Sequence, residues 1–475
     1  MKLKAKVILG IDLGTSGLRA CIVRRQTINN QKFNEEILFE HTIAIPVAKK
    51  CLESNRITQS PEIWIKALKT LLSELTQQID LKIITHLIVD ATSSTVLLFE
   101  PKEQSHTHAL MYNDSHSVKH ALAIDLTVTQ AKQAGSIHCQ QNQNGAQGAS
   151  CTLAKVLSLL ESYPQNKSPV ICHQVDFINH FLCGITNVTD ENNALKLGYD
   201  LINQAWPNWV VDLLAKSNCN VTLPKVVKPG EFLAHISPKI AQTFGFNPEL
   251  KIMAGTTDSI AGFLASGADQ PGDAVTSLGS TIAVKYVSNT PVFDADYGLY
   301  SHRLGKDWLV GGASNAGGEV LKHFYTIEQL KQLNQLITEK DIEHFLKQKP
   351  PSYYPLLTAG ERFPVADAHF APKLPPRPFC DFSEIESSEK CLKAHKRFLL
   401  QLLNGLTEIE VLSYQTLTGL LQPPNNVLNK VYAVGGGTLS PVWMKLREQS
   451  LGVHLCSPKH SQAAYGVTRL IDNKN

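Results

Sequence analysis

A short phrase of glycine and hydroxyl residues occurs twice in this chain, in related form. The first copy is Ile11–Gly17 and the second is Leu278–Thr281, and each lies between two apolar, β-prone runs. This order predicts a strand, a tight turn and a second strand at both places. Glycine lets an anion approach the backbone N–H groups, and Ser and Thr add hydroxyl donors. Two such turns, one from each half of the chain, could hold a polyphosphate from both sides.

The length and the pattern of segments predict two α/β domains. A chain of 475 residues is too long for one ordinary core. Strand-like and helix-like segments alternate along it, which is typical of the α/β class. We place the boundary after residue 262, which gives domains 1–262 and 263–475. We leave open whether the last roughly 20 residues pack back on the first domain.

Individual segments give clear local signals. Ser60-Pro61 is typical of a helix start, and an apolar stripe continues to Ile79. The other predicted features, in chain order, are a strand–turn–strand at His86–Phe99, an exposed or mobile loop at Gln140–Gly148, a strand ending at Gly255 with a helix from Thr256, a hairpin at Asp273–Tyr286, an irregular proline-rich stretch at 350–378, a helix at 394–420, and a strand at Val431–Val434 that runs into glycines.

Composition narrows the class of protein. Hydrophobic residues make up 43% and charged residues 18%, which is typical of a globular chain. The net charge of +3 is too small to indicate a nucleic-acid partner, and no stretch reaches the roughly 18 apolar residues of a membrane span. The ten cysteines form no C-x-x-C pair. We therefore expect reduced thiols in a cytoplasmic protein, with neither nucleic acid nor membrane as partner. For the oligomeric state, a monomer and a homodimer both stay open.

The first candidate site is the acidic end of the first phrase. Asp12 lies at the end of a strand, two residues before the turn residues Gly14, Thr15 and Ser16. A carboxylate in this place can hold Mg²⁺ directly or through water, beside a phosphate. The same residues would also form a plain hairpin turn. The chain contains no Walker-type phosphate loop and no dinucleotide fingerprint after its first strand.

The second candidate is Asp258, at the start of the helix predicted from Thr256. A carboxylate here could serve only the helix, because the first turn favours negative charge. Alternatively, it is a general base that accepts a proton from a substrate hydroxyl as that oxygen attacks a phosphoryl group.

Glycine-rich turns supply the third candidate. Three consecutive glycines, Gly435, Gly436 and Gly437, would let a flat group such as adenosine lie against bare backbone, or would simply lead into a helix. Gly312, within Gly311–Gly318, offers a similar surface. The polar patch Asp190–Lys196, taken alone, favours a loop and a helix start.

The order of these motifs is more specific than any one of them. With Gly10–Ser16, Ala254–Ser259, Thr276–Thr281 and Ala433–Gly437, the chain resembles the FGGY carbohydrate kinases over essentially its whole length. The resemblance implies an actin-like ATPase fold, with two RNase-H-like α/β domains flanking a nucleotide and sugar cleft. It implies phosphate motifs at both hairpins, a catalytic base at Asp258 and an adenosine motif at the three glycines.

Within that family the chain is most similar to plant and cyanobacterial kinases that act on D-ribulose. The similarity lies in the stretches 90–98, 110–113, 193–199, 311–315 and 354–364. In that group a serine at the position of Ser93 contacts the sugar. Two departures from other members support this placement: Tyr112–His116 lacks the Trp and the Arg of a Trp-x-Asp-x-Arg motif, and Ser158 stands where an aromatic residue is common after Lys155.

The resemblance therefore predicts an ATP-dependent kinase for a primary hydroxyl of a small ketose, with D-ribulose converted to D-ribulose 5-phosphate. Asp12 would organise Mg²⁺ and lie near the substrate, Ser93 would contact the sugar and Asp258 would deprotonate it. The alternatives are a kinase for another pentulose or polyol, such as xylulose, L-ribulose or glycerol, and an actin-fold ATPase that phosphorylates no sugar.

Overall fold

The computed structural model describes residues 5–29, 32–51, 55–133, 145–217, 219–294, 296–423 and 426–471. The chain divides into two compact units, Met1–Gly267 with His460–Asn475, and Ala268–Lys459. The division follows Gly267, whereas the predicted boundary after residue 262 falls inside helix α8 (Asp258–Ser266). Helix α8 begins in the first unit and ends at Gly267, which adopts a left-handed φ of 94°.

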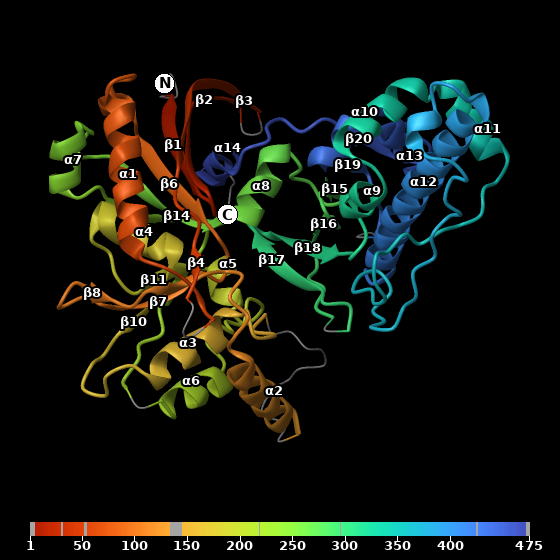
Figure 1. The fold of residues 1–475 in the computed structure, drawn as a ribbon. Coiled ribbons are helices and arrows are strands. Elements are labelled where there is room, and N and C mark those ends of the chain that lie inside the picture. Colours follow the sequence, from red (N-terminus) through yellow and green to blue (C-terminus); the bar gives the residue numbers. More distant parts are fainter. Residues whose placement is uncertain are drawn as a thin grey trace. The chain divides into compact units, whose positions relative to one another are not determined.

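The first unit is built on a large mixed sheet (Figure 1). Its strands, in spatial order, are β13 (Phe232–His235), β14 (Lys251–Thr257), β6 (His86–Ala91), β1 (Lys6–Leu13), β2 (Gly17–Asn29) and β3 (Lys32–Ala44). A second sheet has the order β10 (Val170–His173), β7 (Val96–Glu100), β9 (Ala109–Leu110), β5 (Ile57–Gln59) and β4 (Lys49–Lys50), with β8 (Ser105–His106) beside β7, and β11 (Val188–Asp190) pairs with β12 (Lys225–Val227).

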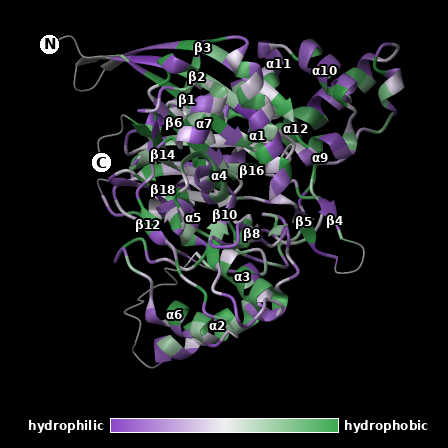
Figure 2. Cartoon of the chain, turned by 90° about the vertical axis from the view of Figure 1, so that its left-hand side faces the viewer, coloured by the Kyte–Doolittle hydropathy of each residue, from purple (hydrophilic) through white to green (hydrophobic). Residues whose placement is uncertain are grey.

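Helices surround these sheets. They are α1 (Pro61–Thr76), α2 (Val118–Gln133), α3 (Thr152–Glu161), α4 (Gln174–Cys183), α5 (Glu191–Leu195), α6 (Asn208–Ala215), α7 (Pro238–Phe244), α8 and the C-terminal α14 (Ala463–Thr468). Helix α1 confirms the predicted start at Pro61, and its apolar stripe is buried against the large sheet. The helices carry both hydrophobic and hydrophilic residues (Figure 2). This pattern is expected for helices that cover a sheet with one face.

The second unit contains one large mixed sheet. Its strands, in spatial order, are β17 (Tyr300–Leu304), β18 (Asp307–Ala313), β16 (Ile282–Ser288), β15 (Asp273–Leu278), β19 (Lys430–Val434) and β20 (His454–Cys456). The helices are α9 (Gly318–Phe324), α10 (Ile327–Leu336), α11 (Glu339–Lys347), α12 (Glu389–Gly419) and α13 (Pro441–Leu451). Helix α12 begins earlier than the predicted 394 because Ser388 caps it, accepting from the Cys391 N–H at 3.3 Å.

The two units repeat one pattern of strand pairing. In the first, β3–β2 and β2–β1 are antiparallel, and β1–β6 and β6–β14 are parallel. In the second, β18–β16 and β16–β15 are antiparallel, and β15–β19 and β19–β20 are parallel. The two predicted hairpins, β1–β2 and β15–β16, are therefore equivalent elements of a duplicated fold.

Glycine contacts fix the C-terminal helix α14 against the first unit, where it lies beside β1 and α8 (Figure 1). A Cβ at Gly466 would overlap the carbonyl oxygen of Ala261 in α8, and one at Gly10 in β1 would overlap that of Ala464. The buried Arg25 donates to the Thr468 carbonyl at 2.9 Å. The C-terminal segment thus supports the two elements that carry Asp12 and Asp258.

Cys380 and Cys391 form a disulfide, so the expectation that all cysteines are reduced is wrong for this pair. The loop before α12 returns Cys380 to the first turn of that helix, with a distance of 6.0 Å between the Cα atoms of Cys380 and Cys391. The sequence could not reveal this loop path.

Residues 140–144 of the predicted Gln/Asn-rich loop lie outside the described residues. Within the described part of the chain, none of the helices has the length and hydropathy that crossing a bilayer requires.

Candidate active site

Three parallel strands of the first unit end side by side and bring acidic groups together. Asp12 in β1 lies opposite Asp90 in β6, and Asp90 lies opposite Thr256 in β14. Strand β14 ends at Thr257, and Asp258 is the first residue of α8. Carboxyl ends of parallel strands are common ligand sites in α/β sheets. This edge is the candidate site in the first unit.

Asp90 is the acid that sequence reasoning missed. It is fully buried, and neither of its carboxyl oxygens has a hydrogen-bond partner in the described residues. Burial, followed by the charges of Asp12 and Asp258, raises its pKa well above the ordinary value. A raised pKa favours the protonated form of this carboxyl group. The signal was present in the sequence, since Asp90 interrupts the apolar strand Leu87–Val89.

Asp12 and Asp258 differ in their surroundings. Asp12 is 4% exposed and accepts from Arg19 Nη1 at 2.8 Å, so its charge is paired. Asp258 is half-buried, and its Oδ1 accepts the Ser259 N–H at 2.7 Å. Its first-turn position fits the helix-start interpretation, and its place at the acidic strand edge fits a reacting group. The two interpretations are compatible.

A polar turn between β6 and β7 lies beside this edge. Ser93 Oγ is buried and has no hydrogen-bond partner among the described residues. Thr92 Oγ1 donates to Gln174 Oε1 at 2.6 Å, and Gln174 Nε2 is also buried without a partner in the described structure. Two unsatisfied buried groups in one polar patch are suited to bind a polar ligand.

Lys155 holds this turn in place. Its side chain is fully buried, and Nζ donates to the carbonyl oxygens of Ser94 at 2.9 Å, Met111 at 2.7 Å and Tyr112 at 3.2 Å. Ser94 has a left-handed φ of 66°, which a non-glycine residue adopts only under constraint. Burial lowers the pKa of Lys155 to about 7.

The polar patch that begins at Asp190 serves as a helix start, as the pattern alone favoured. Asp190 accepts the N–H groups of Asn192 at 2.9 Å and Asn193 at 3.1 Å, so it caps α5. Burial raises its pKa to about 7. The patch still supports the site, because Asn192 Nδ2 donates to Thr256 Oγ1 at 3.0 Å, two residues before Asp258.

The two phosphate-type turns are closed by similar backbone bonds. Gly14 N–H donates to Gly17 at 3.0 Å, and Gly279 N–H donates to Thr281 at 3.2 Å. Ser16 is exposed in the first turn, as are Ser280 and Thr281 in the second. Side-chain hydroxyls at such turns are suited to donate to an anion.

The three glycines lie against the second hairpin. A Cβ at Gly435 would meet the Leu278 carbonyl at 2.9 Å, and one at Gly437 would meet the Trp443 ring at 2.6 Å. A Cβ at Gly436 would meet nothing within 4 Å. Packing therefore explains two of the glycines, and open space adjoins the third. Trp443, whose indole N–H is buried without a partner in the described chain, was not among the predicted site residues.

The comparisons with known proteins agree with these sites. Residues 7–265 match the description "FGGY family of carbohydrate kinases, N-terminal domain". The chain belongs to the FGGY family of carbohydrate kinases. It is thus an ATP-dependent sugar kinase, a phosphotransferase.

Among named relatives, a xylulose kinase of Staphylococcus epidermidis is 22% identical over 97% of this kinase and 88% of its own length. A gluconokinase of Bacillus subtilis is 22% identical over 92% and 82%. The solved xylulose kinase of Lactobacillus acidophilus has a TM-score of 0.70 at 18% identity, with coverages of 98% and 89%. The glycerol kinase of Plasmodium falciparum with ADP has a TM-score of 0.72 at 14% identity, with the same coverages. The kinase therefore has the α/β fold of this family, of the actin-like ATPase type.

Gly312 has a structural explanation that the sequence did not show. It lies inside β18, not in a turn, and a Cβ there would meet the Phe363 ring at 2.5 Å and Leu299 at 2.9 Å. Close packing in the second unit of the kinase therefore requires this glycine. Its contact with the nucleotide stays a prediction.

The two departures from the family pattern lie in one network. Asp114 is fully buried, and Arg56 Nε donates to its two oxygens at 3.0 and 3.1 Å. Arg56 Nη1 also donates to Ser158 Oγ at 2.7 Å. The motif arginine would stand two residues after Asp114, where this chain has His116. Asp114 is paired instead with Arg56, the residue before β5. The hydrogen bonds of Arg56 hold the pKa of Asp114 below its ordinary value, although burial opposes this.

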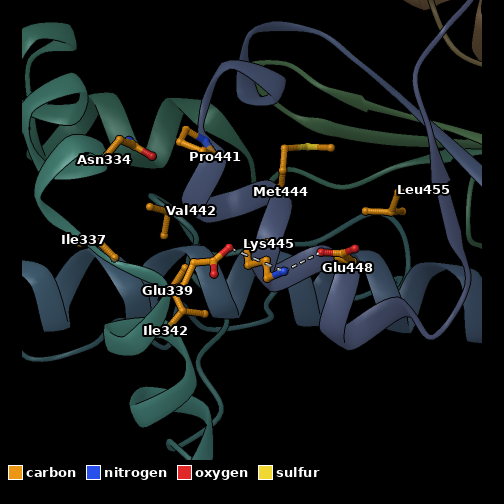
Figure 3. A pocket seen from close by; sticks show the side chains of 10 residues that line it. All are labelled: Asn334, Ile337, Glu339, Ile342, Pro441, Val442, Met444, Lys445, Glu448 and Leu455. Carbon is orange, nitrogen blue, oxygen red and sulfur yellow. Dashed lines mark ion pairs between the residues drawn. The ribbon is translucent and has the colours of Figure 1, made fainter.

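A separate pocket of about 380 Å³ lies within the second unit of the kinase (Figure 3). It is lined by Asn334, Ile337, Glu339, Ile342, Pro441, Val442, Met444, Lys445, Glu448 and Leu455. Lys445 lies between Glu339 and Glu448, at 3.9 and 3.1 Å (Figure 3). None of the three glycines lines it, although Ser440, which follows them, donates to Asn334 Oδ1 at 2.6 Å.

Proposed function

We propose that this kinase transfers the γ-phosphoryl group of ATP to the C5 hydroxyl of D-ribulose and forms D-ribulose 5-phosphate. The observation that carries the proposal is the meeting of Asp12, Asp90 and Asp258 at the carboxyl edge of β1, β6 and β14, next to the unsatisfied Ser93. Phosphoryl transfer needs positioning and charge, and this edge supplies both.

Asp258 is the proposed base. As the sugar oxygen bonds to the γ-phosphorus and the bond to the bridging β–γ oxygen breaks, the hydroxyl proton passes to its carboxylate. Its Oδ1 already accepts a backbone N–H, which fixes the orientation of the side chain. Asp12 and Asp90 lie near Asp258, and the negative charge of these acids favours the binding of a proton or a cation at this edge.

The donor sites for the sugar are proposed at the β6–β7 turn. Ser93 Oγ and Gln174 Nε2 would bond sugar hydroxyls, because each is buried and has no partner in the described residues. The turn is held by Lys155, so its geometry is set before the sugar binds. We also assign Asp12 to the substrate site, together with Ser93.

The nucleotide is assigned to glycine and hydroxyl groups. Adenosine would lie against Gly435–Gly437, where Gly436 adjoins open space. The phosphates would be bound by the turns Gly14–Ser16 and Gly279–Thr281, whose exposed hydroxyls support this role.

Mg²⁺ is the proposed metal. In the described residues no group of three ligating side chains is assembled that could hold a metal by itself. Mg²⁺ commonly takes one or two carboxylates together with substrate phosphates and water, and Asp12 with the unpartnered oxygens of Asp90 beside it fits that demand. When bound, the ion would neutralise charge on the transferred group.

The sugar itself is the finer part of the proposal. The likeness of residues 90–98 and 354–364 to D-ribulose kinases supports D-ribulose. The xylulose kinases among the relatives favour D-xylulose as the second candidate. L-ribulose and glycerol are further alternatives. The monomer or homodimer state is unaffected by this choice.

A coupled kinase screen tests the proposal. ADP release is measured with D-ribulose, L-ribulose, D-xylulose, gluconate and glycerol, and the kcat/KM values are compared. The highest value with D-ribulose supports the proposal, and the highest value with D-xylulose replaces it by the second candidate. ADP release that no sugar accelerates would overturn the assigned transfer reaction.

A further inference from the structure

The segment Gly360–Phe363 is not used by the proposed mechanism, yet it contains a buried carboxylate with an unusual number of donors. Glu361 is 3% exposed. Its Oε1 accepts the N–H groups of Asn315 at 2.7 Å and Arg362 at 2.8 Å, and its Oε2 accepts Ser314 Oγ at 2.6 Å and Tyr354 Oη at 2.8 Å. A carboxylate offers about four acceptor positions, so Glu361 is saturated.

Further bonds join this segment to the loop that follows β18. Asn315 Nδ2 donates to the Gly360 carbonyl at 3.0 Å, and Arg362 Nε donates to Asn315 Oδ1 at 2.8 Å. The Phe363 ring packs against Gly312. Two hydrogen bonds that Glu361 accepts from the loop and two that involve the Asn315 side chain thus fix the loop from one side.

The same loop is joined on its other side to the second hairpin. Ser314 N–H donates to Ile282 at 2.9 Å, and Ile282 N–H donates to Ala316 at 2.7 Å. Gly318 N–H donates to Gly279 at 2.9 Å, and Glu319 N–H donates to Ser280 at 3.1 Å. Two of these four backbone bonds are accepted by Gly279 and Ser280, two of the three residues to which phosphate binding is assigned.

Close packing makes this connection stiff. A Cβ at Gly317 would lie 2.5 Å from the Ser280 carbonyl oxygen and 2.5 Å from the Thr281 Cα, so the loop and the turn are in direct contact. Ser314 Oγ also accepts the Ala316 N–H at 2.9 Å, so the group that bonds Glu361 also shapes the loop. Displacement of Ser314 would therefore move the turn.

We infer that Glu361 is a positioning residue for nucleotide binding, which holds the turn Gly279–Thr281 in its binding geometry through the loop Ser314–Glu319. The inference rests on the proposed role of that turn in binding phosphates. Glu361 itself touches no nucleotide. Tyr354 donates to the same carboxylate and its hydroxyl also interacts with Ser314, but Tyr354→Phe leaves both loop donors of Glu361 in place, so it serves as the milder comparison variant.

The test compares Mg-ADP binding by isothermal titration calorimetry in the full chain. Since misplacement of a binding group by about 1 Å can cost up to about a hundredfold, we expect Glu361→Ala to weaken ADP binding and raise the KM for ATP about tenfold. The KM for the sugar should stay within about twofold. Tyr354→Phe should lower the melting temperature but leave ADP affinity within about twofold, because it removes one donor and leaves Ser314 bonded.

Other variants separate the outcomes. Thr281→Val alters the turn directly; if it binds ADP like the wild type, the proposed function of the turn fails. If Thr281→Val weakens binding and a folded Glu361→Ala does not, the inference alone is overturned. Equal weakening by Tyr354→Phe and Glu361→Ala would also overturn it. If Glu361→Ala does not fold, Glu361→Gln replaces it, since an amide nitrogen cannot accept a hydrogen bond, and an intermediate weakening is expected.

Discussion

The hairpins β1–β2 and β15–β16 have the same pairing partners but opposite electrostatic character. The end of β1 carries Asp12, which lies opposite Asp90 in the next parallel strand. The corresponding place in β15 holds Ser277, which lies opposite Val434. Duplicated backbone geometry was therefore kept while the side chains diverged. The first copy concentrates carboxylates, and the second presents neutral hydroxyls and glycines.

Each unit also contains a buried ionisable side chain that holds a loop of its candidate site, and the two side chains are of opposite type. In the first unit a buried cation, Lys155, donates to three carbonyl oxygens around the Ser93 turn. In the second unit a buried anion, Glu361, accepts from four donors around the loop behind Gly279–Thr281. Each charge is satisfied by neutral partners, so each holds a loop without a salt bridge. The fold therefore determines where a turn lies, whereas the polar side chains around it determine what the turn can bind.

The largest expected effect tests whether the base belongs to the first unit alone. Asp258→Ala should lower kcat by about 10²–10⁴, because the hydroxyl proton loses its acceptor. Steady-state kinetics with the best sugar measures this. Asp258→Asn is the control, since its amide oxygen can still accept the Ser259 N–H. Recovery of near wild-type kcat in Asp258→Asn would show that Asp258 serves only the helix start.

The next prediction converts the first copy toward the second. Asp12→Ser gives the first hairpin the residue found at Ser277. We expect kcat to fall about 10²–10³-fold and the Mg²⁺ requirement to rise, because charge stabilisation by a held cation contributes several kcal/mol. A Mg²⁺ titration of kcat measures both. Ser16→Ala, in the same turn, should have a smaller effect; a larger effect of Ser16→Ala would assign the critical group to the hydroxyl instead.

The reverse exchange should affect binding more than chemistry. Ser277→Asp places a carboxylate next to the proposed phosphates, and like charges repel, so the KM for ATP should rise about tenfold. Ser277→Asn adds nearly the same volume without charge. If both variants raised the KM for ATP equally, the cause would be side-chain size, and the proposed electrostatic difference between the two hairpins would be contradicted.

The smallest predicted effect concerns two buried groups of the first unit that titrate near neutral pH in opposite directions. Asp190 has a folded pKa of about 7 against 3.8 unfolded, so the folded state binds more protons and stability falls as pH rises from 6 to 8. Lys155 has a folded pKa of about 7 against 10.5, so the unfolded state binds more protons and stability rises over the same range. Each contribution is about 1 kcal/mol, and they nearly cancel.

Single substitutions should expose each contribution. Relative to the wild type, the stability of Asp190→Asn should rise between pH 6 and 8, and that of Lys155→Met should fall. Urea unfolding at pH 6, 7 and 8 measures the slopes. Slopes of the same sign in the two variants would contradict the assignment of the two groups.

The sequence predicted the hairpins, α1 and the Asp258 helix because their signals are local. Alternating apolar residues, glycine turns and a proline at a helix start act within a few residues. Asp90 was missed because its importance comes from its register with Asp12, which lies 78 positions away in the chain. The packing role of Gly312 was missed for a similar reason, since Phe363 approaches it from a distant segment. The disulfide between Cys380 and Cys391 also depended on a loop path that no local pattern describes.

The return of the chain to the first unit has a consequence for biosynthesis. Helix α14 packs on β1 and α8, and Thr468 bonds the buried Arg25, so the unit that holds Asp12, Asp90 and Asp258 contains residues from both ends of the chain. During translation, helix α14 of the first unit is synthesised only after the whole second unit. Domains usually fold as they appear, N-terminal first. Here the second unit can complete its own fold while the first is still missing a piece, so a prematurely terminated product would carry the acidic residues without the helix that supports them.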